Sequence, residues 1–507
     1  MSWTPEDLEQ WDEKIRERVS YYGLSCYPQD FEICDHADMI GYMAYLGMPA
    51  HYPHWSYGKS YEKLETLYKY GISGLPYEMV INANPSLAYL MKDNSLLLQI
   101  LTVAHVYGHN DFFRNNALFK ATNAEHAMSM FKAHAGIVRE YIEDPSIGID
   151  KVEGVLDAAH ALSFHRAHRY IGKKETREQQ IDRLREKYFP KELRDSPLLY
   201  ARQSPEDRKK AEAEFLADTQ RTPIDPDPDL LLFIADNNPL LSEWERNLLR
   251  FADEDAQYFI PQIETKIMNE GWASYWHKRI LDDLDLPEGL RVEFAVRHNQ
   301  VLRPHEGGLN PYHLGFTLWN AICLWYDGSR DPEAIHPFEK SLFNEMKRDF
   351  EMRDAIPVGT GSKSGHEVIF SIRASDRDTS FLQRFLTPPL MRQLDLFSFK
   401  EQGEKLVIDE ISDEDGWLKI KSKLIGQIGM NSTPVIRVLD ANSGGERTLL
   451  LEHIHDGRDL ELSYAERTLA HVYKLWRRSV VLNTSIGGKA TALVYGDKGF
   501  STRTAKN

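Results

Sequence analysis

The sequence predicts a mainly helical N-terminal domain followed by a smaller α+β domain with an antiparallel sheet. Apolar residues recur at helical spacing through most of the first 365 residues, and the run 96–103 is apolar without Pro, as in a buried helix. Beyond Gly365 the pattern changes to short alternating segments separated by turns that contain Gly. We therefore expect one domain at 1–390 and a second at 391–507.

A charged segment interrupts the first of these domains. Residues from about 173 to 229 are dense in charge, and the segment ends with Pro223, Pro226 and Pro228. Closely spaced prolines exclude both a helix and a central strand. The segment therefore predicts a charged helical insertion followed by a stiff linker.

Local signals place the other elements. Thr4, followed by Pro5 and two acidic residues, is typical of a helix N-terminus, and Gly23 is expected to end that helix. Further helices are predicted at 29–47, around the apolar run, and at 243–286, 412–428 and 463–476. Strands are predicted at 77–82 and 366–372, and in hairpins that pair 394–399 with 405–411, 435–439 with 448–455, and 480–484 with 490–495.

Composition narrows the classes of partner. The formal net charge of the 507-residue chain is -16, which argues against a nucleic-acid partner and against an anionic membrane surface. The chain has no run of about 18 apolar residues, so we expect no membrane insertion. Its acidic N-terminus lacks the apolar segment of a signal peptide, and Cys26, Cys34 and Cys323 do not form a disulfide framework. These features predict a cytoplasmic protein.

Two histidines stand four residues apart at the end of the apolar run. His105 and His109 would lie one turn apart on the same face of a helix, where two imidazoles can hold one metal ion. The spacing is that of the H-E-x-x-H zinc motif, but Val106 replaces the glutamate that activates water. The pair therefore predicts metal binding without the usual catalytic base.

A later segment supplies the expected third ligand. In one group of zinc peptidases the third ligand is a glutamate that opens a Glu-Gly-Trp-Ala-x-Tyr segment, and residues 270–275 resemble it at each position. The resemblance implies a zincin-like helical core with His105, His109 and Glu270 as metal ligands. Gly271 within a helix costs about 1 kcal/mol relative to Ala, which predicts that another backbone or a ligand approaches closely there.

Four longer strings resemble the SpoVR-like family, named after stage V sporulation protein R. They lie at 105–116 (HVYGHNDFFRNN), 269–277, 310–315 (NPYHLG) and 377–399, and the resemblance covers nearly the whole chain. It implies a link to formation of the spore cortex, which is peptidoglycan. The expected partner is therefore a peptide or peptidoglycan-related substrate, or a protein.

Catalysis would require a base other than the residue at position 106. Glu125, Asp111 and His126 are the candidate bases nearest to the histidine pair in sequence, and we select Glu125. Tyr275 and His277, which lie on the helix of Glu270, or Tyr312 would polarise a carbonyl. His277 lies two helical turns from Glu270, about 10.5 Å along the axis, so we expect it beside the metal rather than bound to it.

Three interpretations remain open at this point. The chain is a zinc-dependent hydrolase with a displaced base, a metal-binding pseudoenzyme that binds a peptide or protein partner, or a scaffold whose histidines are structural and bind no metal. Two histidines and one carboxylate with open positions also fit non-haem iron as the alternative to zinc.

Overall fold

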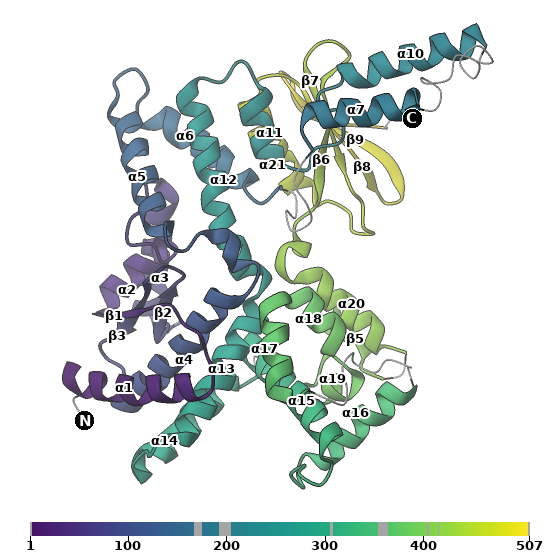
Figure 1. Cartoon of the computed structure of the whole chain (residues 1–507). Coiled ribbons are helices and arrows are strands. Elements are labelled where there is room, and N and C mark those ends of the chain that lie inside the picture. Colours follow the sequence, from purple (N-terminus) through teal and green to yellow (C-terminus); the bar gives the residue numbers. More distant parts are fainter. Residues whose placement is uncertain are drawn as a thin grey trace. The chain divides into compact units, whose positions relative to one another are not determined.

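The structure of the chain is a computed structural model that describes residues 3–72, 74–166, 175–191, 204–304, 308–352, 363–402, 405–413 and 415–504 (Figure 1). It divides into two compact units, each built from two segments of the chain. The first unit comprises residues 1–137 and 257–432, and the second comprises 138–256 and 433–507. The two units are described separately.

Helix α4 (Leu96–Asn115) lies at the centre of the first unit. It begins at Ser95, whose hydroxyl accepts a hydrogen bond from the backbone N–H of Leu98. Residues 97–113 of this helix are all buried, so α4 is covered by protein on every side. The apolar run that predicted a buried helix forms its first half.

The first unit is mainly helical, as the sequence predicted. Its other helices are α1 (Pro5–Tyr21), α2 (His36–Ala44), α3 (Trp55–Lys69), η1 (Phe119–Thr122), α13 (Lys266–Asp283), α14 (Glu288–Leu302), α15 (Pro311–Arg330), α16 (Lys340–Met352), α17 (Gly365–Ser375), α18 (Asp378–Phe385), α19 (Pro388–Gln393), α20 (Trp417–Gln427) and η2 (Gly429–Ser432). The boundaries between the units fall within α5 (Ala127–Glu143) and α12 (Glu243–Glu264).

A small three-stranded sheet lies in the N-terminal part of the first unit. It contains β1 (Gln29–Cys34), β2 (Glu78–Ile81) and β3 (Ser86–Met91) in the order β1-β3-β2, with β1 parallel and β2 antiparallel to β3. The strand predicted at 77–82 is confirmed as β2. The helix predicted at 29–47 is wrong in its first part, because 29–34 pair with β3 and the helix begins only after Asp35, which caps it.

Glycines allow the central helices to approach at backbone distance. A Cβ on Gly108 of α4 would lie 2.6 Å from the Cα of Ala273 in α13. A Cβ on Gly271 would lie 2.3 Å from the carbonyl carbon of Gly315 in α15. The close approach of a backbone predicted at Gly271 is therefore confirmed, and α13 is held tightly between α4 and α15 (Figure 1).

The second unit is an α+β arrangement around a five-stranded sheet. Its strands are β6 (Ile436–Ser443), β7 (Thr448–His453), β8 (Val480–Ile486), β9 (Lys489–Gly496) and β10 (Gly499–Thr504), in the order β10-β9-β8-β7-β6. Its helices include α6 (Ile149–Leu162), α7 (Arg177–Tyr188), α10 (Pro205–Gln220), α11 (Leu230–Asn237) and α21 (Leu462–Trp476). The sheet is antiparallel except for β7 and β8, which confirms the predicted fold class.

Residues 391–432, which the sequence analysis groups with the C-terminal domain, belong to the first unit by their contacts. They form the hairpin of β4 (Phe397–Gln402) and β5 (Lys405–Ile411), as predicted, followed by α20. The ammonium of Lys421 in α20 donates to the carbonyls of Gln383 and Leu386, which fastens this segment to α18.

The strand predicted at 366–372 is wrong. These residues lie in α17, where Ser364 and Glu367 form a capping box at the helix N-terminus. Val368, Ile369 and Ile372 are buried on one face of that helix, a spacing that the shorter alternation of the sequence concealed. Among the described residues, no helix is both long enough and apolar enough to cross a membrane.

Candidate metal centre

Three elements of the first unit bring four ionisable side chains together. Helix α4 presents His105 and His109 one turn apart, α13 presents Glu270, and strand β2 presents Glu78. The backbone N–H groups of Ile267 and Met268 at the start of α13 donate to the Asp378 carboxylate at 2.8 Å each, which fixes the end of the helix that carries Glu270. The predicted ligands His105, His109 and Glu270 therefore meet in space.

The imidazole nitrogens of the two histidines face the same carboxylate oxygen. The Oε2 of Glu270 lies 3.7 Å from the Nε2 of His105 and 3.5 Å from the Nε2 of His109. The Oε1 of Glu78 lies 3.9 Å from the Nε2 of His105. One ligand atom from each of Glu78, His105 and His109 lies within 4.8 Å of the others, a spacing that suits a common metal ion.

The other ring nitrogens point away from this cluster and have protein partners. The Nδ1 of His109 lies 2.9 Å from the Oδ1 of Asn269, and because an amide oxygen only accepts, Nδ1 carries the proton and Nε2 presents its lone pair. The Nδ1 of His105 lies 2.9 Å from the Nδ1 of His277. Both imidazoles are thus turned so that Nε2 faces the carboxylates.

The spacing of these atoms fits an ion better than hydrogen bonds. Hydrogen bonds between N and O span about 2.7–3.2 Å, whereas the ligand atoms of a tetrahedral zinc site with bonds of 2.0–2.2 Å lie roughly 3.3–3.6 Å apart. The separations of 3.5 and 3.7 Å are close to the second range. The Nε2 of His105 and the Oε2 of Glu270 are buried without a hydrogen-bond partner. A cation between them would satisfy both atoms.

Burial and the mutual charges shift the pKa values of the cluster in opposite directions. Burial lowers the pKa of His105 to about 4 and raises the pKa of Glu78 to about 7. Burial alone would raise the pKa of Glu270 and lower that of His109, but their mutual attraction outweighs it and reverses both directions. At neutral pH the centre therefore carries negative charge on Glu270, which attracts a cation.

Of the three other predicted site residues, His277 lies beside the histidine pair, whereas Glu125 and Tyr275 have other partners. Glu125 is exposed in the turn before α5, where its carboxylate accepts from the Asn84 side chain, and no described contact brings it to the cluster. The hydroxyl of Tyr275 lies 3.2 Å from the Sγ of Cys323 within the apolar core, away from the cluster. His277 is fully buried, and its Nδ1 lies 2.9 Å from the Nδ1 of His105, so it stands next to a predicted ligand, as expected from the sequence.

One residue of the site, Glu78, was not selected from the sequence as a ligand or catalytic group, whereas Tyr312 was one of the groups expected to polarise a carbonyl. Glu78 lies at the start of a strand that was predicted, but its position in the sequence forms no metal-binding motif with the histidine pair. The ring of Tyr312 in α15 stacks on His105 with centroids 6.0 Å apart, and the charge of Glu270 raises its pKa. Tyr312 stands beside the centre because Asn310 caps the start of α15 and sets the direction of its first turn.

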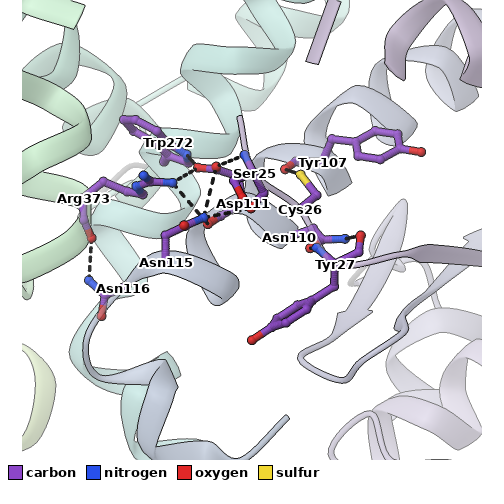
Figure 2. A network of polar contacts seen from close by, with 10 residues as sticks. All are labelled: Ser25, Cys26, Tyr27, Tyr107, Asn110, Asp111, Asn115, Asn116, Trp272 and Arg373. Carbon is purple, nitrogen blue, oxygen red and sulfur yellow. Dashed lines mark hydrogen bonds and ion pairs between the residues drawn. The ribbon is translucent and has the colours of Figure 1, made fainter. Parts of the chain in front are cut away.

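A second buried polar network lies one turn further along α4. The carboxylate of Asp111 accepts from Arg373 at 2.6 Å, from the indole of Trp272 at 2.9 Å and from the backbone of Ser25 at 2.7 Å (Figure 2). Burial raises the pKa of Asp111, while Arg373 and these hydrogen bonds act against it. This network joins α4, α13, α17 and the segment that precedes β1.

An apolar cavity of about 320 Å³ lies against the strand that carries Glu78. Met79, Val80 and Ile81 of β2 form one wall. The remaining lining residues come from the end of α2, the loop that follows it, and α12: Met43, Leu46, Gly47, Met48, Tyr258 and Gln262. A small apolar group would fit this cavity.

Comparison with known proteins agrees with the resemblance stated for the sequence. A family described as SpoVR like protein matches residues 2–433, and a second one described as SpoVR-like C-terminal domain matches 434–486. The chain is 33% identical over 497 residues to the uncharacterized protein YcgB of Escherichia coli (strain K12). The aligned region covers 95% of this chain and 92% of that protein. No solved structure matches the chain.

Proposed function

The chain belongs to the SpoVR family, and we propose that it is a metal-dependent hydrolase of the peptidase or amidase type. One observation carries the proposal. The Nε2 atoms of two histidines, at 3.7 and 3.5 Å, surround one buried Glu270 oxygen that has no hydrogen-bond partner. A cation between the two imidazole nitrogens and the carboxylate oxygen, or a proton on one of the nitrogens, stabilises such an arrangement.

His105, His109 and Glu270 would hold the ion, with Glu78 beside it. Two histidines and a carboxylate with an open position are the donor set of catalytic zinc sites, and they also suit non-haem iron. A bound zinc ion supplies a Lewis acid that polarises a carbonyl oxygen and lowers the pKa of water to about 7. The chain supplies the orientation, since α4 is buried, the start of α13 is capped by Asp378, and β2 is paired with β3.

Glu78 is our candidate for the base that is missing at Val106. Val106 is buried in the core and cannot accept a proton. The Glu78 carboxylate approaches from another element, strand β2, and its Oε1 lies 3.9 Å from the Nε2 of His105. From that position it would accept the proton of the attacking water, while Tyr312 on the other side of His105 would donate to the carbonyl oxygen of the substrate.

We propose a peptide or a peptidoglycan-related peptide in the cytoplasm as the substrate. Among the described strands, β2 is at an edge of its sheet, and the apolar cavity against it would take an apolar side chain next to the bond that is cleaved. The absence of the motif glutamate favours one alternative, a metal-binding pseudoenzyme that uses the same cleft to bind a peptide or protein partner.

Turnover separates the two functions. The metal-loaded protein is incubated with peptidoglycan-derived peptides and fragments, and new amino groups are measured. We expect hydrolysis that Glu78→Gln lowers by about 10²–10⁴-fold per bound metal ion, because the proton acceptor is lost. Glu125→Gln is the matched control, and it should leave the rate unchanged because Glu125 is exposed away from the centre.

Bound metal without any turnover would contradict the hydrolase and favour the pseudoenzyme. In that case Val106→Glu is the informative companion variant, because it places a carboxylate at the position of the base in H-E-x-x-H enzymes. Weak hydrolysis by Val106→Glu alone would identify a peptidase cleft that has lost its base.

A further inference from the structure

Three buried imidazoles form a continuous chain that starts at the proposed metal centre. The Nδ1 of His105 lies 2.9 Å from the Nδ1 of His277, and the Nε2 of His277 lies 2.8 Å from the Nδ1 of His298. The three residues come from α4, α13 and α14, and they are 3%, 0% and 6% exposed. Both contacts have hydrogen-bond length, so each ring is tied to the next.

Because a neutral imidazole carries one N–H proton, the two hydrogen bonds among these three histidines can run in only two ways. Each neutral ring has one N–H donor and one lone pair. In the first arrangement His105 donates from Nδ1 to His277, and His277 donates from Nε2 to His298, which leaves the Nε2 of His105 with a free lone pair. In the second arrangement both hydrogen bonds run the other way, and the Nε2 of His105 carries a proton toward Glu270.

Only the first arrangement allows His105 to bind a cation. The ring must present the lone pair of Nε2 to the ion, and His277 must then accept from Nδ1. His109 differs, because its Nδ1 faces the amide oxygen of Asn269, which cannot donate. The tautomer of His109 is therefore fixed by Asn269, which can only accept at that oxygen. The tautomer of His105 depends on whether His277 accepts or donates, and His298 in turn affects this choice.

We propose that His277 and His298 are positioning residues that hold His105 in its metal-binding tautomer. Neither touches the ion. His277 accepts the proton of His105, and His298 accepts the proton of His277, so that the whole chain points away from the centre. This inference rests on the metal centre proposed above. It gives His277, which the sequence placed beside the metal, a positioning role instead of the polarisation of a carbonyl.

The packing around the chain supports a directional role. The ring of His298 lies against the rings of Phe294 and Phe316, with centroids 5.8 and 5.2 Å away. These rings bring no hydrogen-bonding group to His298, and His298 is the described hydrogen-bond partner of the Nε2 of His277. A buried His277 without His298 would lose the acceptor that favours the first arrangement.

The test measures metal affinity rather than activity. The dissociation constant for Zn²⁺ is measured by competition with a chromophoric chelator for the full-length parent, His277→Phe, His277→Asn and His298→Phe. Loss of such outer partners weakens metal binding by about 10–100-fold, and we expect His277→Phe in that range. His277→Asn should rescue most of the affinity, because its amide oxygen stands close to the former Nδ1 and accepts from His105.

His298→Phe should weaken binding less than His277→Phe, since His277 itself remains. It is also the variant to use if His277→Phe does not fold, because His298 is closer to the surface. His126→Phe, at an exposed histidine of the first unit, is the matched control and should leave the constant unchanged.

The melting temperatures of the chelated proteins show whether a variant acts through folding alone. A positioning role predicts that metal raises the melting temperature of His277→Phe less than that of the parent. Equal Zn²⁺ affinity of the parent, His277→Phe and His298→Phe would overturn the inference and leave the metal centre intact. A parent without Zn²⁺ binding would instead overturn the centre and the inference together.

Discussion

Two buried polar clusters lie one turn apart on α4, and they differ in whether the protein satisfies them. The Asp111 network is closed at its carboxylate, which accepts from Arg373, Trp272 and Ser25 (Figure 2). The cluster of His105 and Glu270 is open, because the Nε2 of the one and the Oε2 of the other have no hydrogen-bond partner. A buried carboxylate that is fully hydrogen-bonded by the protein stabilises the fold. Equally buried polar atoms without a partner indicate a binding site for an ion or ligand.

The largest effect on stability is expected from the closed network. Asp111→Ala leaves the buried Arg373 guanidinium without its partner, which should lower the free energy of unfolding by about 3–5 kcal/mol. The loss should be the same with metal and after chelation, as measured by denaturant unfolding. Lys278→Ala on α13 breaks an exposed ion pair and is the control, with an expected change below about 1 kcal/mol. A loss that appeared only in the metal-loaded protein would remove the distinction between the clusters.

The stability contributed by the open cluster should depend on bound metal. Zn²⁺ at 100–1,000 times its dissociation constant should stabilise the parent by about 3–4 kcal/mol, because it binds the folded state. Chelation should reverse this gain, and thermal unfolding with and without chelator measures it. The double variant His105→Ala, His109→Ala should melt at one temperature under both conditions. An equal chelator effect in parent and double variant would place the metal elsewhere.

A smaller effect is expected at the residue between the two clusters. Gly271 separates Glu270 of the open cluster from Trp272 of the closed one, and a Cβ there would meet the backbone of Gly315 at 2.3 Å. Gly271→Ala should therefore lower the free energy of unfolding by about 1–3 kcal/mol, as measured by denaturant unfolding. Gly136→Ala in α5 has free space around the new methyl group and should be neutral or stabilising. Equal behaviour of the two variants would contradict the close crossing of α13 and α15.

The sequence was sufficient for the parts of the site that follow local periodicity. The spacing of His105 and His109 predicts their common face, and the Glu-Gly-Trp-Ala-Ser-Tyr segment indicates Glu270. The strand predicted at 77–82 was confirmed, but nothing local indicated that Glu78 reaches the same point, because that contact depends on how β2 packs beside α4. The hydrogen bond between His105 and His277 spans 172 residues and depends in the same way on tertiary packing.

The mistaken elements have a similar cause. Residues 366–372 alternate as a strand would, yet Ser364 caps a helix that buries Ile369 against the centre of the unit. Residues 29–34 have too few apolar positions to reveal a strand alone, and they become one through pairing with β3. In both segments, tertiary contacts outweighed the weak preference of the local sequence.

Elemental analysis of the purified protein tests the central claim most directly. The parent, the double variant His105→Ala, His109→Ala and the exposed control His126→Ala are purified identically, and metal is measured per chain. The open cluster predicts about one zinc or iron ion in the parent and in the control, and nearly none in the double variant, because two of three ligands are lost. A parent without stoichiometric metal, even after incubation with Zn²⁺ or Fe²⁺, would contradict the metal centre and leave a protein whose buried histidines are structural.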